Sequence, residues 1–162
     1  MKGTMFVGFD VSHDTMNKSL SYGSLVASLN NSVSRFFSIV TAHKTGEELS
    51  NEIGLNLVKA LRKYQEANED ALPTRIIIYR DGVGDGQIPY VCKHEIAMIK
   101  EKLTEVYGSE VWRMAFLIVS KRINTRIFAA SNNGNPPPGT VSMTASLCQR
   151  GKNHFFMIMN KN

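Results

Sequence analysis

The order of its apolar segments is the feature that most restricts how this chain can fold. Three short runs typical of strands come first, at residues 5–11, 22–29 and 35–41. The Asn30-Asn31-Ser32 cluster between the second and third runs favours a turn. These runs predict an antiparallel meander. The first run is apolar on both faces, so its strand belongs in the centre of a sheet.

The spacing of apolar residues changes after Gly46. Apolar side chains then recur every fourth position with charges on the opposite face, which predicts an amphipathic helix of about five to six turns. Its expected core positions are Leu49, Ile53, Leu57 and Leu61. Pro73 cannot continue the helix, because its ring clashes with the preceding turn.

A second alternation of strand and helix follows. Residues 75–80 predict a buried strand, and the turn-prone segment 81–86 comes directly after it. A second amphipathic helix is expected to contact the core through Val91, Ile96, Ile99, Leu103 and Val106. Further strands are predicted over residues 115–119, 125–130 and 154–160.

The resulting order is three strands, a helix, a strand, a helix and a strand. Three antiparallel strands followed by right-handed crossovers through helices build a mixed sheet with helices packed on it. This is the order of the RNase H-like fold. The predicted fold class is therefore α/β, an RNase H-like mixed sheet of three antiparallel strands and then alternating helices and parallel strands, flanked by helices. A chain of 162 residues with 43% apolar content suits a single domain over residues 1–162.

Charge and composition narrow the class of partner. The formal net charge is +5, from 19 Lys and Arg against 14 Asp and Glu, and this balance is compatible with a polyanionic partner. No apolar run approaches the roughly 20 residues that cross a bilayer, so no membrane association is expected. Cys92 and Cys148 are far apart in the sequence with no second thiol near either, so neither a zinc pair nor a disulfide framework is readable, and a reducing compartment is favoured.

Two acidic residues follow predicted strands that the RNase H-like order places side by side. Asp10 comes at the end of the first strand and Asp81 directly after the fourth, so their carboxylates are expected to converge. Two close carboxylates repel, and a divalent cation such as Mg²⁺ relieves that repulsion. Two such ions about 4 Å apart can activate water for phosphodiester cleavage. The alternative is that each Asp only forms a turn, which is also the expected role of Asp14 and Asp85.

Basic residues cluster around a later predicted strand. Lys121, Arg122 and Arg126 could contact the phosphates of a nucleic acid, and such contacts position a backbone without reading its sequence. The alternative is a solvated edge strand whose basic side chains discourage aggregation. Arg80, next to Asp81, could support the acidic site electrostatically.

Several segments together resemble the PIWI domain of Argonaute proteins. The segments are VGFDVSHD at 7–14, GEEL at 46–49 and YRDGVGDGQ at 79–87, of which the last is the most specific. SKRINTRIF at 120–128 and PPPGTV at 136–141 are similar to later family segments, in the same order, and favour the PIWI subfamily. The resemblance covers roughly residues 4–141.

The resemblance implies a guide-directed, piRNA-type endoribonuclease that cuts target RNA opposite a bound small RNA with Mg²⁺ or Mn²⁺. The family's catalytic set is an Asp, a Glu from before the first helix, a second Asp, and a final His or Asp. By motif, Asp10, Glu48 and Asp81 match the first three, with Asp10 and Asp81 as metal ligands. The family pattern Gly-x-Glu-Leu favours Glu48 over the neighbouring Glu47. Capping the positive end of the helix is the default role of both acids.

The fourth catalytic residue has no match in this sequence. In the family it lies well past the GTV segment, and this chain stops at Asn162, so the resemblance implies a PIWI domain that is incomplete at its C-terminus. His154 is expected to be a surface histidine. The isolated chain is therefore expected to cut RNA weakly or not at all. The implied partners are a guide small RNA, a target RNA and silencing-granule proteins, in the cytoplasm and its perinuclear granules, with the nucleus left open.

Two other functions stay open. The chain could be a binding or regulatory module that retains the fold and contacts RNA or proteins without cutting, since the fourth ligand is absent and a basic strip is present. It could also be another RNase H-like enzyme, such as a nuclease that cleaves RNA·DNA hybrids or an integrase, because a fold alone does not fix an activity.

Overall fold

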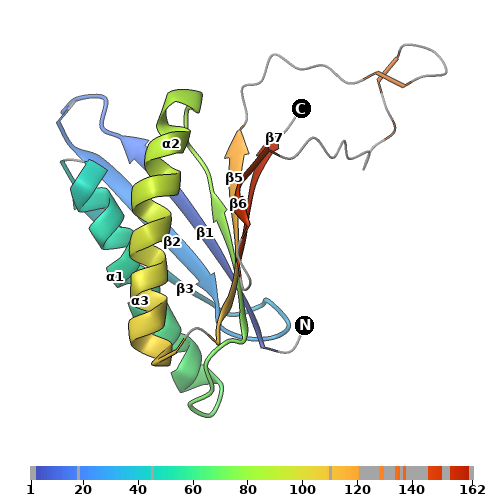
Figure 1. The fold of residues 1–162 in the computed structure, drawn as a ribbon. Coiled ribbons are helices and arrows are strands. Elements are labelled where there is room, and N and C mark those ends of the chain that lie inside the picture. Colours follow the sequence, from blue (N-terminus) through green and yellow to red (C-terminus); the bar gives the residue numbers. More distant parts are fainter. Residues whose placement is uncertain are drawn as a thin grey trace.

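A mixed sheet with helices across one face forms the body of the molecule (Figure 1). The structure is a computed structural model that describes residues 3–17, 19–44, 46–109, 111–120, 128–129, 134–135, 137, 146–150 and 154–160. Within these residues the sheet has seven strands in the order β3-β2-β1-β4-β5-β7-β6. The strands are β1 (Thr4–His13), β2 (Ser21–Ser28), β3 (Phe36–His43), β4 (Arg75–Arg80), β5 (Arg113–Ser120), β6 (Ser146–Arg150) and β7 (His154–Asn160).

Strand pairing confirms the predicted topology. β1 pairs with β2, and β2 with β3, in antiparallel orientation, which is the expected meander. β4 lies parallel to β1 on the other side, β5 lies parallel to β4, and β7 lies parallel to β5. β1 therefore lies inside the sheet, between β2 and β4, as its apolar sequence predicts.

The helical layer consists of α1 (Gly46–Ala67) and a composite segment. That segment begins with the 3₁₀ turn η1 (Asp85–Gln87) and continues through α2 (Ile88–Tyr90), the π-helical η2 (Val91–Glu95) and α3 (Ile96–Tyr107). α1 and α3 lie side by side across one face of the sheet (Figure 1). The predicted core positions of both helices are buried, except for Val106, which is partly buried against the core.

The length of α1 is as predicted, and one strand boundary is wrong. α1 has 22 residues, about six turns, and ends at Ala67, where the Asn68 side chain donates hydrogen bonds of 2.7 Å to the carbonyls of Tyr64 and Leu29. The next residues, Glu69 and Asp70, have positive φ angles that no α-helix can continue. β1 extends to His13, past the predicted end, because β2 pairs with it over this length.

The C-terminal third departs further from the sequence prediction. β7 confirms the predicted strand over residues 154–160, while β6 was not predicted. The strand predicted over residues 125–130 is wrong at Phe128 and Ala129, which have no strand conformation. The rest of that predicted strand lies outside the described residues.

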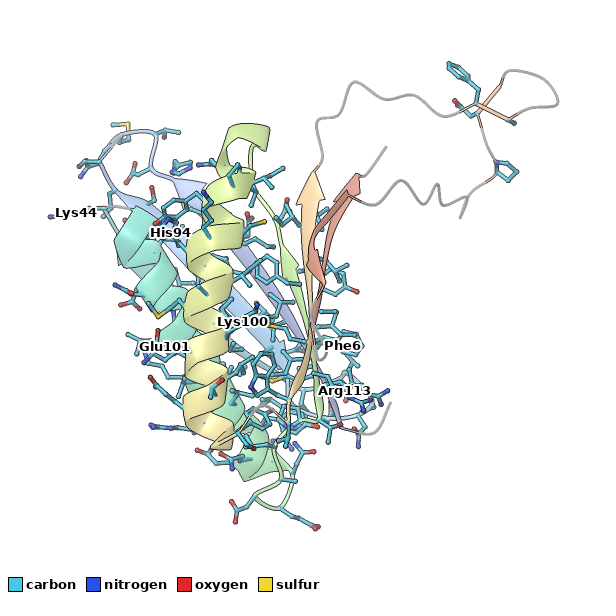
Figure 2. All side chains as sticks on the ribbon, viewed as in Figure 1. Phe6, Lys44, His94, Lys100, Glu101 and Arg113 are labelled. Atoms are coloured by element: carbon cyan, nitrogen blue, oxygen red, sulfur yellow. The ribbon has the colours of Figure 1, made fainter. Side chains whose placement is uncertain are left out.

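The two faces of β1 and β4 are chemically different. Residues facing the helices are buried in the core, namely Met5, Val7 and Phe9 in β1 and Ile76 and Ile78 in β4. The alternate residues of both strands, including Phe6 and Tyr79, lie on the opposite face, which we call the outer face. Acidic residues occur in the helical layer as well, on the other side of the sheet, where Glu101 of α3 is exposed (Figure 2). The predicted acidic site belongs to the outer face.

Two further sequence predictions concern the whole chain. In the described part of the chain, no helix combines the length and apolar character of a membrane span. Cys92 of η2 is disulfide-bonded, although no disulfide framework was readable from the sequence. Spacing in the sequence could not show this bond, because only the fold determines which thiols approach each other.

Candidate metal site on the outer face

The structure brings Asp10 and Asp81 together. The parallel register of β1 and β4 ends with Phe9 beside Arg80, and the Asp81 N–H continues it by donating a 2.9 Å hydrogen bond to the Phe9 carbonyl. Asp10 is the next residue of β1, and Asp81 follows directly after the end of β4. Phe9 and Arg80 are buried on the helix side, so alternation puts both Asp side chains on the outer face. Asp10 is exposed there and Asp81 is half-buried.

Gly82 allows the chain to turn close to the Asp10 carboxylate. Its φ angle is +73°, and a Cβ built on it would lie only 2.9 Å from Asp10 Oδ1. A side chain here would therefore be strained and would also collide with the acid. Val83, the next residue, is buried in the core and anchors the loop. The positive φ angle of Gly82 and the burial of Val83 thus fix the direction of the chain after Asp81.

Each carboxylate is oriented by a neighbouring backbone N–H. Asp10 Oδ1 accepts a 2.8 Å hydrogen bond from the N–H of Val11, and Asp81 Oδ1 accepts a 2.8 Å bond from the N–H of Gly82. A carboxylate has about four acceptor positions, so it can accept a backbone N–H and also bind a cation. Oxygen donors on adjacent strands suit Mg²⁺ or Mn²⁺. The described residues contain no group of three or more His, Cys, Asp or Glu that could hold a metal ion.

The start of α1 lies at the same end of the sheet. A Cβ on Gly23 would lie 3.3 Å from Leu49 Cδ1 and 3.0 Å from the Phe9 ring, so Leu49 packs against the residues beside Asp10. Glu48 precedes Leu49 in α1, and its backbone is therefore near the site end of β1. The side chains of Glu47 and Glu48 lie outside the described residues, so the choice between them stays a prediction.

Sequence reasoning missed one residue next to the site, Glu95. Its side chain is 1% exposed and pairs with Arg80, whose side chain is 5% exposed. The signal was present in the sequence, because Glu95 lies four residues after Val91 and four before Ile99, both core positions. A charged residue in a core position of a helix needs a buried partner. Arg80 supplies it, so the expected electrostatic role of Arg80 toward the acids is replaced by an ion pair with Glu95.

Other candidate residues divide between confirmed turn roles and untested positions. Asp14 is a turn residue as predicted, since its Oδ1 accepts hydrogen bonds from the N–H groups of Met16 and Asn17. These backbone bonds lower the pKa of Asp14. Asp85 lies in η1 and His154 in β7, but their side chains are outside the described residues. The predicted nucleic-acid contacts Lys121, Arg122 and Arg126 also lie outside the described residues.

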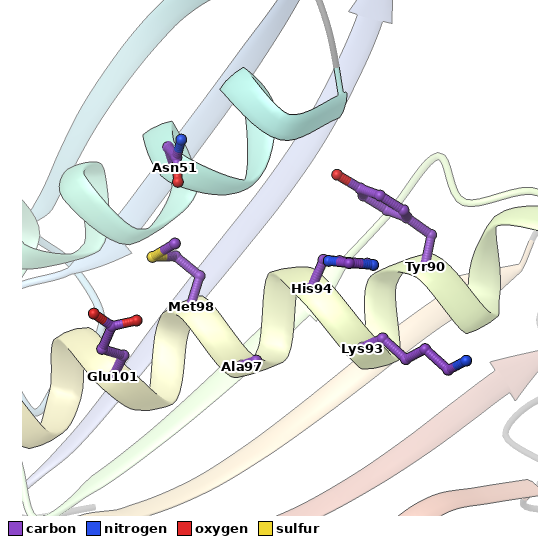
Figure 3. A pocket seen from close by; sticks show the side chains of 7 residues that line it. All are labelled: Asn51, Tyr90, Lys93, His94, Ala97, Met98 and Glu101. Atoms are coloured by element: carbon purple, nitrogen blue, oxygen red, sulfur yellow. The ribbon is translucent and has the colours of Figure 1, made fainter.

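A pocket of about 230 Å³ lies in the helical layer, and neither Asp10 nor Asp81 lines it (Figure 3). Tyr90 and His94 project from the composite helix and stack with ring centroids 4.5 Å apart. The lining residues are Asn51, Tyr90, Lys93, His94, Ala97, Met98 and Glu101. The pocket is therefore a separate feature from the acidic pair on the sheet.

Known proteins similar to this chain in sequence and in structure are Piwi and Argonaute proteins. The Piwi domain family model matches residues 1–162. Piwi-like protein Siwi of Bombyx mori is 54% identical over 139 residues, which are 85% of this chain and 15% of Siwi. The crystal structure of Drosophila Piwi superposes with a TM-score of 0.72 at 35% identity, covering 86% of this chain and 18% of that one. The structure of Kluyveromyces polysporus Argonaute with a guide RNA gives a TM-score of 0.59 at 31% identity, covering 65% and 12%.

These similarities define an Argonaute-type PIWI module with the predicted RNase H-like fold. The chain belongs to the Piwi domain family, and the predicted resemblance to the PIWI subfamily is confirmed. It spans less than a fifth of the length of each of these three proteins.

Proposed function

We propose that this chain is the catalytic part of a small-RNA-guided endoribonuclease that cuts target RNA in gene or transposon silencing. The observation that carries the proposal is the placement of Asp10 and Asp81 side by side on the outer face of β1 and β4. Membership of the Piwi family supports the guide-directed, piRNA-type form of the reaction. Guide-directed cleavage by a longer PIWI protein that contains this chain is part of the same proposal.

In this proposal Asp10 and Asp81 hold a divalent cation, Mg²⁺ or Mn²⁺, and Glu48 completes the site from the start of α1. A bound cation of this kind would lower the pKa of water and stabilise charge on a phosphodiester. The residues of this chain position the two carboxylates. The N–H groups of Val11 and Gly82 orient the carboxylates, and the β1–β4 ladder fixes the separation of the two strands.

The decisive test replaces Asp81 by Ala in a longer PIWI protein that contains this chain. Cleavage of guide-matched RNA with Mg²⁺ should be lost, because the cation would lose one of its two described carboxylate ligands. Glu101→Ala is the matched control, since it removes an exposed acid from the helical layer. Undiminished cleavage by Asp81→Ala would reject the catalytic assignment.

The isolated chain should cut guide-matched RNA weakly or not at all. The family pattern uses four catalytic residues, and three of them, Asp10, Glu48 and Asp81, have a match in this sequence. Purified chain should therefore show no Mg²⁺-dependent product above the background of Asp10→Ala. Robust cleavage by the purified chain, abolished in Asp10→Ala, would contradict this expectation.

The proposed partners are a guide small RNA and a target RNA. The related Kluyveromyces polysporus structure contains a guide RNA, and the net charge of +5 suits a polyanion. Lys121, Arg122 and Arg126 are the proposed phosphate contacts. Silencing-granule proteins are further proposed partners, and the proposed location is the cytoplasm, including perinuclear granules.

A second candidate function is a silencing module that binds RNA or proteins without cutting. The net charge of +5 motivates this candidate, because it suits binding of a polyanion whether or not the RNA is cut. RNA affinity led by phosphate contacts should fall steeply with rising salt, because binding releases counterions. A filter-binding series from low to high salt measures the slope. Salt-independent affinity would count against phosphate-led binding, and cleavage abolished by Asp81→Ala would exclude the non-catalytic candidate.

A further inference from the structure

The buried pair between Arg80 and Glu95 joins the acidic site to the helical layer. Arg80 Nε donates to Glu95 Oε2 at 3.0 Å, and Arg80 Nη2 donates to Glu95 Oε1 at 3.1 Å. This two-point geometry uses one edge of the guanidinium and both oxygens of the carboxylate. With side chains 5% and 1% exposed, neither group can exchange its partner for water without opening the core.

A further donor of Arg80 acts on the site itself. Arg80 Nη1 donates a hydrogen bond to the carbonyl of Asp81. The guanidinium also lies over the Phe9 ring, with its carbon 4.9 Å from the ring centroid. Arg80 thus contacts the backbone of one acid and the residue that precedes the other, Asp10.

We propose that Arg80 and Glu95 are positioning residues for the metal site, an inference that rests on the proposed function. Asp81 is fixed by its N–H to the Phe9 carbonyl and by its carbonyl to Arg80. Glu95 holds Arg80 in that orientation. The pair acts through geometry and not through charge, because the positive guanidinium is neutralised by a carboxylate in direct contact with it.

The role makes Arg80→Lys the informative variant. Lysine keeps the positive charge beside Glu95 but cannot form the two-point contact and also reach the Asp81 carbonyl. If the pair acts through geometry, the Arg80→Lys chain should bind Mn²⁺ about tenfold more weakly than the unmodified chain, the lower end of the effect of residues that orient metal ligands. If the pair acts through charge alone, the Mn²⁺ affinity of the variant should be unchanged. Glu95→Asp is the second variant, since it keeps both charges and shortens the reach by one methylene.

The experiment measures Mn²⁺ binding to the full 162-residue chain by electron paramagnetic resonance of the free ion, well below the unfolding temperature. Ile99→Ala is the control for lost stability, because Ile99 is fully buried on α3, one turn beyond Glu95. Arg80→Lys and Glu95→Asp should each weaken Mn²⁺ binding, while Ile99→Ala retains the affinity of the unmodified chain.

The outcomes separate the inference from the proposed function. Binding that Asp81→Asn abolishes but that both pair variants retain would overturn the positioning role and leave the metal site standing. If the pair variants and Ile99→Ala weaken binding equally, the pair is structural only and the inference fails. Absence of Mn²⁺ binding, or binding that Asp10→Asn and Asp81→Asn leave unchanged, would overturn the metal site and the inference with it. Should Arg80→Lys fail to fold, the Glu95→Asp comparison decides in the same way.

Discussion

Replacing Gly82 by Ala should damage the acidic site in two separable ways. The first is backbone strain, because Gly82 has a φ of +73°, where an L-residue costs about 1–2 kcal/mol. The alanine also restricts the unfolded chain, which offsets roughly 0.5 kcal/mol of that cost. The expected loss from strain alone is therefore about 1 kcal/mol of unfolding free energy.

The second effect is a collision with Asp10. The new Cβ would lie 2.9 Å from Asp10 Oδ1, whereas ordinary contact begins at 3.4 Å, so the carboxylate must retreat by roughly 0.5 Å. Its hydrogen bond from the Val11 N–H would then be weakened, at a cost of about 1 kcal/mol. A ligand displaced by this distance should also reduce Mn²⁺ affinity, on the order of tenfold.

Gly108 provides a matched control for the strain. Its φ is +67°, close to that of Gly82, but no atom lies within 4 Å of a Cβ built on it. Gly108→Ala should therefore cost about 1 kcal/mol and leave Mn²⁺ binding unchanged. Urea unfolding and Mn²⁺ titration of both variants separate strain from collision.

A double-mutant cycle with Asp10→Ala tests the collision directly. Removing the Asp10 carboxylate should reduce the cost of Gly82→Ala to that of Gly108→Ala, which gives a coupling of about 1 kcal/mol between positions 10 and 82. If Gly82→Ala and Gly108→Ala cost the same and both retain Mn²⁺ binding, the close approach of Gly82 to Asp10 has no energetic consequence and the reasoning is refuted.

Two further predictions concern the start of α1 and the end of α3. Gly23→Ala would place a Cβ 3.0 Å from the Phe9 ring and 3.3 Å from Leu49. This overpacking should lower the free energy of unfolding by about 1–3 kcal/mol, measured by urea unfolding. An unchanged urea midpoint would contradict this packing. Burial and the neighbouring Tyr64 raise the pKa of Tyr107, whose hydroxyl donates to the Pro73 carbonyl. The unfolded phenol ionises first, near pH 10, so stability should fall as the pH rises above that value, and Tyr107→Phe should lessen the fall. An identical alkaline decline in both proteins would show that Tyr107 does not contribute.

Local patterns were sufficient to predict the elements that form the body of the fold. The fourfold spacing of Leu49, Ile53 and Leu57 predicted α1, and uninterrupted apolar runs predicted β1 and β4. The predicted five to six turns agree with the length of α1, but the residue that ends the helix could not be predicted, because Asn68 reaches the carbonyl of Leu29, directly after β2. β6 was missed because SLCQR lacks the alternation of a half-buried strand.

The candidate site was predictable only in part, for a similar reason. Asp10 and Asp81 could be placed together because topology alone makes β1 and β4 parallel neighbours. The contact between Gly82 and Asp10 depends on a backbone angle that glycine permits but does not require. Spacing along the sequence marks Glu95 as a core position, but its partner Arg80 is determined by where η2 meets the end of β4.

The pair also explains why the acids occupy the correct face of the sheet. Arg80 and Asp81 are consecutive, and strand alternation sends one side chain into the core and the other to the outer face. A slip of β4 by one residue would exchange them, expose Arg80 and bring Asp81 inward toward Glu95. Two buried carboxylates would then repel each other without a cation between them. The same ion pair that holds the Asp81 carbonyl therefore disfavours the register in which the acidic site would be lost.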